Sequence, residues 1–172
     1  VYQEKNTNTL LTAVMQLYNN QIIRNIDSIA KGFSNVCEAT GLMGRWQQIQ
    51  ENPIVICDTG HNEAGWKDLS LQIKNQKCLN LRIVFGMVDD KDIEAVMALL
   101  PENAHYYWTQ PSTKRAFAVA KIAEVGERYG LKGKAFTNVE EAYKQALSES
   151  DEDDFIFVGG SSYVVADLLS KF

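Results

Sequence analysis

The sequence predicts an α/β protein with a doubly wound, mostly parallel six-stranded sheet, preceded by two helices. Three observations support this class. From residue 53 onward, short apolar runs alternate with amphipathic stretches, most of the stretches are long enough for a crossover helix, and polar turns separate the two. Helices of about ten or more residues between buried strands favour parallel pairing with right-handed connections.

Hydrophobic periodicity places the expected elements along the chain. Two helices are predicted at the start, because the spacing is helical through Leu10, Leu11, Val14 and Leu17, and again through Ile22, Ile26, Ile29 and Phe33. Six strands are predicted over residues 44–50, 53–58, 80–87, 104–109, 133–137 and 154–158, the first antiparallel and at or near an edge. Five helices are predicted over residues 63–76, 91–100, 114–129, 139–149 and 161–171.

Local signals mark several element ends and a domain boundary. Pro53 and Gly60 bound the apolar run 53–58, and Asn138 is placed to cap a helix whose third position is Glu141. The stretch 38–41 breaks the helical pattern, so residues 1–40 are expected to be separate from a domain over 41–172. Because the sequence starts at Val1 rather than methionine, we interpret it as a fragment of a longer protein.

Composition bounds the class of protein. Hydrophobic residues make up 45% and charged residues 23% of 172 residues, which is typical of a soluble globular protein. The net charge of −5 argues against a nucleic-acid surface, and no apolar run of about 18 residues predicts a membrane span. Cys37, Cys57 and Cys78 stand far apart without a neighbouring histidine, which predicts reduced core residues rather than a disulfide framework or a metal site.

Polar residues crowd the turns that follow the predicted parallel strands. The carboxyl ends of parallel strands meet at one edge of a sheet, where open α/β folds bind ligands. This edge is therefore the candidate site, and we call it the carboxyl edge. Its loops are expected to be 58–62, 86–92, 109–115 and 159–162.

Each candidate residue at this edge has a functional and a structural interpretation. Ser161 follows two glycines and opens a helix, so the segment either binds an anion or simply caps that helix. Asp58 either accepts ribose hydroxyls or caps its own turn, the latter being the commoner role. His61 lies in a glycine-flanked turn, where it can donate to phosphate oxygens or carry a proton, although a lone histidine carries little weight.

Three basic residues complete the candidate set. Lys91 lies among three carboxylates at an expected helix start, where acidic residues also serve simply to oppose the helix dipole. Arg115 and Arg45 either hold a carboxylate or phosphate or are solvated surface residues.

Several familiar motifs are absent from the sequence. There is no G-x-x-x-x-G-K-[ST] phosphate loop and no G-x-G-x-x-G turn, and Tyr163 stands where a G-x-S-x-G nucleophile elbow needs glycine. A nucleotide would therefore need a second domain to complete its site, and acyl-enzyme hydrolysis is disfavoured.

Taken together, five segments of the sequence resemble a known family. They are Gly44-Arg45-Trp46-Gln47, the run from Pro53 to Asn62, Asp90-Lys91-Asp92, Arg115-Ala116 and Gly159-Gly160-Ser161. In order and spacing they resemble the carboxyl-terminal domain of the folylpolyglutamate synthase/dihydrofolate synthase family, within the Mur ligase superfamily. Residues 1–40 resemble the end of that family's central ATPase domain. The sequence departs from the family pattern at Gly60, where alanine is common, and at Glu63, where proline is common.

The resemblance implies an ATP-dependent ligase that activates a folate or dihydropteroate carboxylate as an acyl phosphate and joins it to L-glutamate. It implies a cytoplasmic enzyme that uses Mg²⁺ and, in many members, K⁺, with the metal ligands and the phosphate loop in N-terminal and central domains outside this sequence. By this likeness, Arg45 and Asp58 contact ATP, His61 approaches the terminal phosphate, and Ser161, Lys91 and Arg115 face the glutamate. The fragment alone is expected to be inactive.

One alternative from another functional class stays open. It is a non-catalytic Rossmann-like module that binds a nucleotide or a protein partner.

Overall fold

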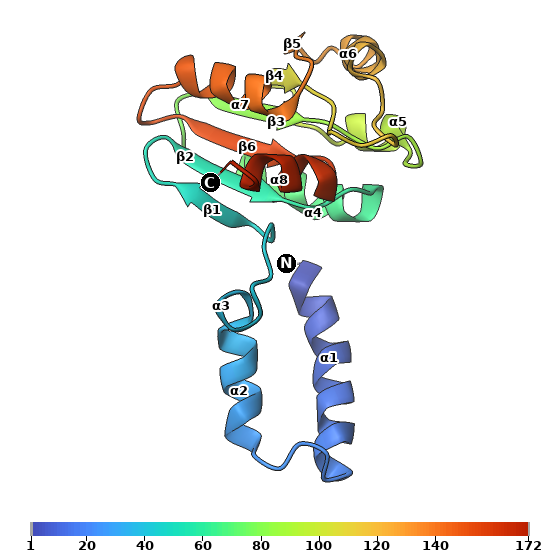
Figure 1. The fold of residues 1–172 in the computed structure, drawn as a ribbon, viewed down its shortest axis with the longest axis vertical. Coiled ribbons are helices and arrows are strands. Elements are labelled where there is room, and N and C mark those ends of the chain that lie inside the picture. The colour runs from blue at the N-terminus through green and yellow to red at the C-terminus, as the bar shows by residue number, and fades with distance from the viewer. Residues whose placement is uncertain (1, 172) are drawn as a thin grey trace. The chain divides into compact units, whose positions relative to one another are not determined.

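The computed structural model describes residues 2–171 and divides into two compact units, with the division between Met43 and Gly44. The first unit is helical and contains α1 (Tyr2–Asn19), α2 (Ile26–Ser34) and α3 (Val36–Thr40) (Figure 1). The prediction of two helices before the sheet therefore missed the short α3. The cause is local, because Asn35 leaves the helical conformation and separates α3 from α2, whereas the apolar spacing gives no sign of a break there.

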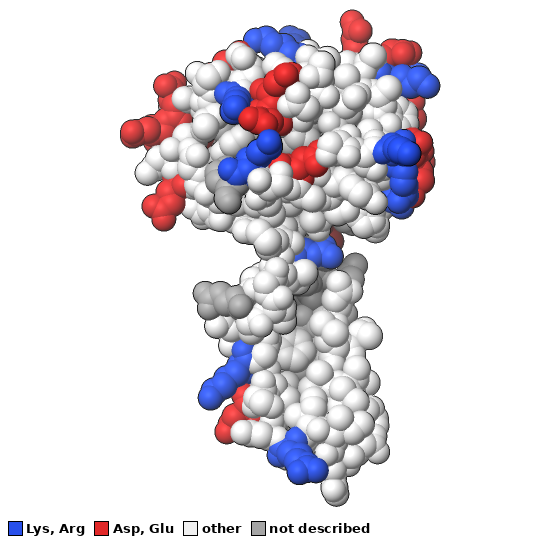
Figure 2. Space-filling model, in the orientation of Figure 1, with Lys and Arg blue, Asp and Glu red and all other residues white. Residues whose placement is uncertain are grey.

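The helical unit leaves many apolar side chains in solvent. Ile22 is 69% exposed and Ile26 is 53% exposed, and no residue of α2 is buried. Figure 2 shows a largely uncharged surface over this unit. The amphipathic faces predicted from the sequence are present, but within the unit they find little to pack against.

The second unit contains the predicted six-stranded sheet, in the order β1-β2-β6-β3-β4-β5. Its strands are β1 (Gln47–Gln50), β2 (Ile54–Asp58), β3 (Leu81–Phe85), β4 (His105–Trp108), β5 (Gly133–Ala135) and β6 (Phe155–Gly159). The pair β1–β2 is antiparallel and the other neighbours are parallel. The expected fold class is confirmed, including the antiparallel strand at one edge.

Helices cover both faces of the sheet in this unit (Figure 1). They are α4 (Glu63–Lys74), α5 (Ile93–Met97), α6 (Val119–Arg128), α7 (Val139–Ser148) and α8 (Ser162–Leu169). One apolar core lies between the sheet and α4, α5 and α6, and includes Trp66, Phe85 and Phe157. The other lies against α7 and α8 and includes Val84, Val158 and Leu168. The expected cap of α7 is present, since the Asn138 side chain accepts from the Glu141 amide.

Several predicted elements are shorter in the structure, and the helix expected over 114–129 changes most. It begins only at Val119, because the preceding segment pairs instead with the loop after β3. Ala116 forms an antiparallel bridge with Val88, and the Asp89 amide donates to the Arg115 carbonyl at 2.8 Å. This tertiary pairing overrides the helical pattern in the sequence, and it ties the loops after β3 and β4 together.

None of the helices in residues 2–171 is both long and apolar enough to cross a membrane.

A polar network around Glu149, at the end of the sheet opposite the carboxyl edge, predicts a stability that depends on pH. The Glu149 carboxylate accepts from Lys134 Nζ at 2.8 Å, Tyr107 Oη at 2.6 Å and Gln145 Nε2 at 2.7 Å. These hydrogen bonds lower the pKa of Glu149 from 4.5 to about 2. A depressed carboxyl pKa contributes stability above pH 4.5 that is lost as the pH falls toward 2.

We therefore expect Glu149→Gln to lower the free energy of unfolding at pH 7, and the gap from wild type to close near pH 2. Because the side chain is 34% exposed, solvent screening limits the gap at pH 7 to about 1 kcal/mol. Urea unfolding at a series of pH values measures it, with exposed Glu152→Gln as the control. A gap that stays constant down to pH 2 would contradict the assignment.

Candidate functional site

The carboxyl edge gathers loops that lie far apart in the sequence. Asp58 at the end of β2 is the register partner of Gly159 in β6, and Gly159 is also the partner of Phe85 at the end of β3. The Gly86 amide then donates to the Gly159 carbonyl at 3.2 Å. The turns after β2, β6 and β3 are therefore side by side, as the parallel topology predicts.

Asp58 is the buried anchor of this edge, with 1% of its surface exposed. One carboxylate oxygen accepts from the Trp46 amide at 2.7 Å and the other from the Gly60 amide at 2.8 Å. Burial raises the pKa of Asp58, while these two hydrogen bonds and the charge of Arg45 oppose that rise. The carboxylate thus joins the segment before β1 to the turn after β2, which is the structural role considered above.

The segment Gly44–Trp46 is a tight turn rather than the start of a strand. The strand predicted over 44–50 begins only at Gln47, because Gly44 and Trp46 both have positive φ, +73° and +44°. This conformation is costly for tryptophan, but the Asp58 hydrogen bond and ring contacts with Phe155 and Phe157, at centroid distances of 6.3 and 6.1 Å, hold it. The turn presents Arg45, which is exposed, next to Asp58.

His61 lies in the turn after β2 and is exposed. Its Nδ1 lies 3.1 Å from the Thr59 carbonyl oxygen. Because a carbonyl can only accept, Nδ1 carries the proton and Nε2 is left to face another group. The next residue, Asn62, caps α4 by accepting from the Gly65 amide at 2.9 Å, so the histidine is held immediately before a helix start.

Gly60, where the family resemblance expects alanine, has a packing reason in this protein. A Cβ at this position would lie 2.2 Å from Leu69 Cδ1 and 3.3 Å from Asp58 Oδ1. The buried Leu69 side chain of α4 therefore occupies the space that a methyl group would take.

Ser161 lies on the neighbouring turn and caps α8. Its hydroxyl accepts from the Val164 amide at 3.2 Å, and the residue is buried. The preceding Gly160 has φ +100°, and a Cβ there would lie 2.5 Å from the Gly86 carbonyl oxygen. Only glycine fits this turn, and the resulting geometry places the serine and the amino end of α8 at the carboxyl edge.

A charged cluster occupies the loops after β3 and β4. Arg115 forms an ion pair with Asp90, and Lys91 Nζ lies 3.5 Å from the same carboxylate. Desolvation raises the pKa of Asp90, but the charges of Arg115 and Lys91 outweigh this effect and hold the pKa below its ordinary value. The Arg115 guanidinium also interacts with the Tyr163 side chain, two residues after Ser161.

The six candidate residues thus fall into two groups on the same edge. Arg45, Asp58 and His61 form the first, around the turn after β2. Lys91, Arg115 and Ser161 form the second, linked through Asp90 and Tyr163. All of them come to the carboxyl edge.

Sequence reasoning missed two residues that organise these groups. Trp46 holds the turn before β1, and Tyr163 connects α8 to Arg115. Tyr163 had one available signal, because it is a large aromatic residue directly after the serines that start the helix. No local sequence signal marks Trp46, because its left-handed conformation depends on Asp58, twelve residues away.

Charge over the sheet unit is mixed. Figure 2 shows acidic and basic side chains interspersed on the face in view, without an extended field of one sign. Among the side chains that the structure describes, no group of three or more histidine, cysteine, aspartate or glutamate residues is arranged to hold a metal ion.

Comparisons with known proteins match this sheet unit. The family model described as "Mur ligase, glutamate ligase domain" matches residues 44–162. The dihydrofolate synthase/folylpolyglutamate synthase of Escherichia coli is 31% identical over 129 residues, which is 74% of this chain and 30% of that protein.

Solved structures agree with the sequence matches. Escherichia coli FolC in complex with DHPP and ADP superposes with a TM-score of 0.69 at 29% identity, covering 76% of this chain and 31% of that one. A bifunctional folylpolyglutamate synthase/dihydrofolate synthase with Mn, AMPPNP and L-glutamate bound gives a TM-score of 0.68 at 30% identity, covering 76% and 31%. The chain spans between about a sixth and two fifths of the length of the first curated relatives that it matches.

Proposed function

The chain belongs to the Mur ligase family, as its glutamate ligase domain, and from this premise we propose that it is the carboxyl-terminal part of an ATP-dependent ligase. The proposed reaction joins L-glutamate to folate or dihydropteroate. The observation that carries the proposal is the gathering of an exposed histidine, a buried aspartate, a capped helix start and three basic residues at one sheet edge, within the region that the family model covers.

We assign residues 1–40 to the end of a central ATPase domain and residues 41–172 to the glutamate ligase domain. The exposed apolar side chains of the helical unit support this assignment, since a folded domain normally buries such faces. The preceding N-terminal and central domains would complete both the core around these helices and the active site.

On the nucleotide side, we assign Arg45 and Asp58 to ATP and His61 to its terminal phosphate. Each Asp58 oxygen already accepts one backbone N–H, and the residue is 1% exposed. Ribose hydroxyls would therefore use the second lone pairs after the surrounding turns move apart on nucleotide binding. His61 has its Nδ1 engaged by Thr59, which leaves Nε2 to donate to a phosphate oxygen when the ring is protonated. Arg45 adds an exposed positive charge beside them.

On the amino-acid side, we assign Ser161, Lys91 and Arg115 to L-glutamate. The acceptor carboxylate would first take the terminal phosphoryl group of ATP and release ADP. The glutamate amine would then attack the carbonyl carbon of this acyl phosphate and lose a proton to solvent as the C–N bond forms, and phosphate would leave with the electrons of the C–O bond. Negative charge develops on oxygen in this step, and His61, the cations and the amides at the start of α8 are placed to stabilise it once domain closure excludes water. Orienting the amine supplies further rate enhancement.

Mg²⁺ and K⁺ enter the proposal only through the family. By the family likeness, we assign the metal ligands to the preceding domains and derive no step from them here. The proposed location is the cytoplasm.

The test is an assay of glutamate-dependent phosphate release from ATP with dihydropteroate and with folate as acceptors. We expect the full-length protein to turn over and the 172-residue chain alone to be inactive, because the phosphate loop is absent from it. Phosphate release that does not depend on glutamate would contradict the ligase. A full-length protein that binds ATP without turnover would favour the non-catalytic module instead.

A further inference from the structure

The strand β5 is the edge of the sheet opposite β1, and its three residues are all exposed. On its inner side, the Lys132 carbonyl accepts from the Tyr106 amide at 3.0 Å, and the Phe136 amide donates to the Trp108 carbonyl at 2.8 Å. Because backbone groups alternate along a strand, Gly133 and Ala135 direct their N–H and C=O groups outward. This edge therefore offers a row of hydrogen-bonding groups to another strand.

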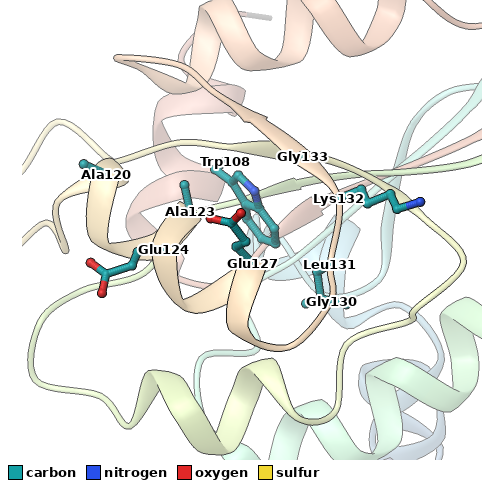
Figure 3. A pocket seen from close by; sticks show the side chains of 9 residues that line it. All are labelled: Trp108, Ala120, Ala123, Glu124, Glu127, Gly130, Leu131, Lys132 and Gly133. Atoms are coloured by element: carbon teal, nitrogen blue, oxygen red, sulfur yellow. The ribbon is translucent and has the colours of Figure 1, made fainter.

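A hollow flanks β5 on the face covered by α6, and we call it the acidic hollow. It has a volume of about 730 Å³ and is lined by Trp108, Ala120, Ala123, Glu124, Glu127, Gly130, Leu131, Lys132 and Gly133 (Figure 3). Glu124 and Glu127 are exposed and form no ion pair within the described part of the chain. The hollow is therefore suited to a basic side chain.

Gly133 lies where the strand edge meets the acidic hollow. Any Cβ at this position would lie 2.4 Å from Trp108 Nε1 and 2.6 Å from Tyr106 Cβ, so the position has to be glycine. The Trp108 ring and Tyr106 fill the space that a side chain at this position would take. A long side chain from a neighbouring strand would therefore pass along the Trp108 ring toward Glu127.

A second hollow, the basic hollow, flanks β5 on the face covered by α7. It measures about 260 Å³ and includes His105, Lys132, Lys134 and Glu149 in its lining. Lys134 pairs with Glu149 at 2.8 Å, whereas the Lys132 ammonium group forms no ion pair with the side chains that the structure describes. An acidic side chain suits this face.

From these features we propose that the outer edge of β5 binds an extended peptide segment in which basic and acidic side chains alternate. Side chains along a strand point alternately to the two faces of the sheet. A basic residue opposite Gly133 would thus enter the acidic hollow, and its acidic neighbour would face the basic hollow. Main-chain hydrogen bonds to Gly133 and Ala135 supply affinity, and the two hollows supply specificity.

Charge disfavours a second copy of this chain as the occupant. Antiparallel pairing of two β5 strands about a two-fold axis normal to the sheet would place the Glu124 and Glu127 carboxylates of both copies on the same face. Like charges that are brought to the same face repel one another. A heterologous peptide avoids this conflict.

The probe is a fluorescein-labelled eight-residue peptide in which arginine and glutamate alternate. Its control has the same composition, with four arginines followed by four glutamates, and therefore the same net charge. Fluorescence polarisation with the 172-residue chain is expected to give binding at least about tenfold tighter for the alternating peptide. Equal binding of both peptides would overturn the proposal, because it would show non-specific charge attraction. Self-association of the chain through β5, detected by light scattering, would also overturn it.

Two variants separate the contributions of backbone hydrogen bonds and of charge to the affinity for the alternating peptide. Ala135→Pro removes an outward N–H without touching the ladder to β4, and Ala135→Ser keeps that N–H as the matched control. Joint replacement Glu124→Gln and Glu127→Gln removes the acidic charge from exposed positions. Both the proline variant and the glutamine pair are expected to weaken the alternating peptide about tenfold or more, and the serine variant to leave it unchanged. Wild-type affinity in the glutamine pair contradicts the proposal even if the proline variant fails to fold.

Discussion

Asp58→Ala is expected to lower the free energy of unfolding by about 3 kcal/mol. The substitution leaves the partly buried Trp46 and Gly60 amides without their acceptor, the buried Asp58 carboxylate, and a fully buried orphaned donor costs about 1–3 kcal/mol. Relief of the buried charge, whose cost appears as the raised pKa of Asp58, offsets part of that loss. Urea denaturation of the purified chain at pH 7 measures the difference.

Two further variants make this result specific. Asp58→Asn keeps one carbonyl-type acceptor, so its free energy of unfolding is expected to fall by about half as much as that of Asp58→Ala. Asp153→Ala removes an exposed carboxylate elsewhere and is expected to change the free energy of unfolding by less than about 0.5 kcal/mol. If Asp58→Ala is as stable as wild type, the carboxylate does not anchor the carboxyl edge. Its two loops would then be held by other contacts.

His61→Ala is expected to reduce the ligase rate of the full-length protein by about a hundredfold or more while leaving stability unchanged. The rate effect follows from removing the hydrogen-bond donor that we propose for the developing phosphate and acyl charge, and such a loss costs about 3–4 kcal/mol in comparable sites. Stability is preserved because the side chain is exposed and makes one hydrogen bond, to the Thr59 carbonyl. Steady-state phosphate release and thermal unfolding measure the two effects separately.

The sequence contains a second histidine that serves as the matched control. His105 is also exposed, but it begins β4 at the opposite end of the sheet. His105→Ala is expected to retain the wild-type rate. Equal losses in the two variants, or a normal rate in His61→Ala, would remove His61 from the catalytic assignment.

The sheet was predictable because its signals are local and repeated. Each buried strand is a short apolar run between turn residues, and the run Ile54–Asp58 was placed to within one residue. Parallel pairing then followed from the crossover lengths, and the convergence of Asp58, Lys91 and Ser161 on one edge followed from that pairing. What brought the residues together was topology, which short sequence patterns encode well.

The errors arise where distant contacts decide local conformation. The residues before Val119 have a helical pattern but pair with the loop after β3, and Gly44–Trp46 leaves the strand because Asp58 captures the Trp46 amide. Tyr163 became visible as a link to Arg115 only in three dimensions. No local propensity reports such contacts, because the partner lies on another element.

We propose that the carboxyl edge of the sheet unit is one half of the ligase site, which the preceding domains complete. A crystal structure of the full-length protein with an ATP analogue and L-glutamate is the direct test. We expect Arg45, Asp58 and His61 to contact the nucleotide, and Ser161, Lys91 and Arg115 to contact the amino acid. Nucleotide and glutamate bound wholly within the preceding domains, with this edge facing solvent, would contradict it.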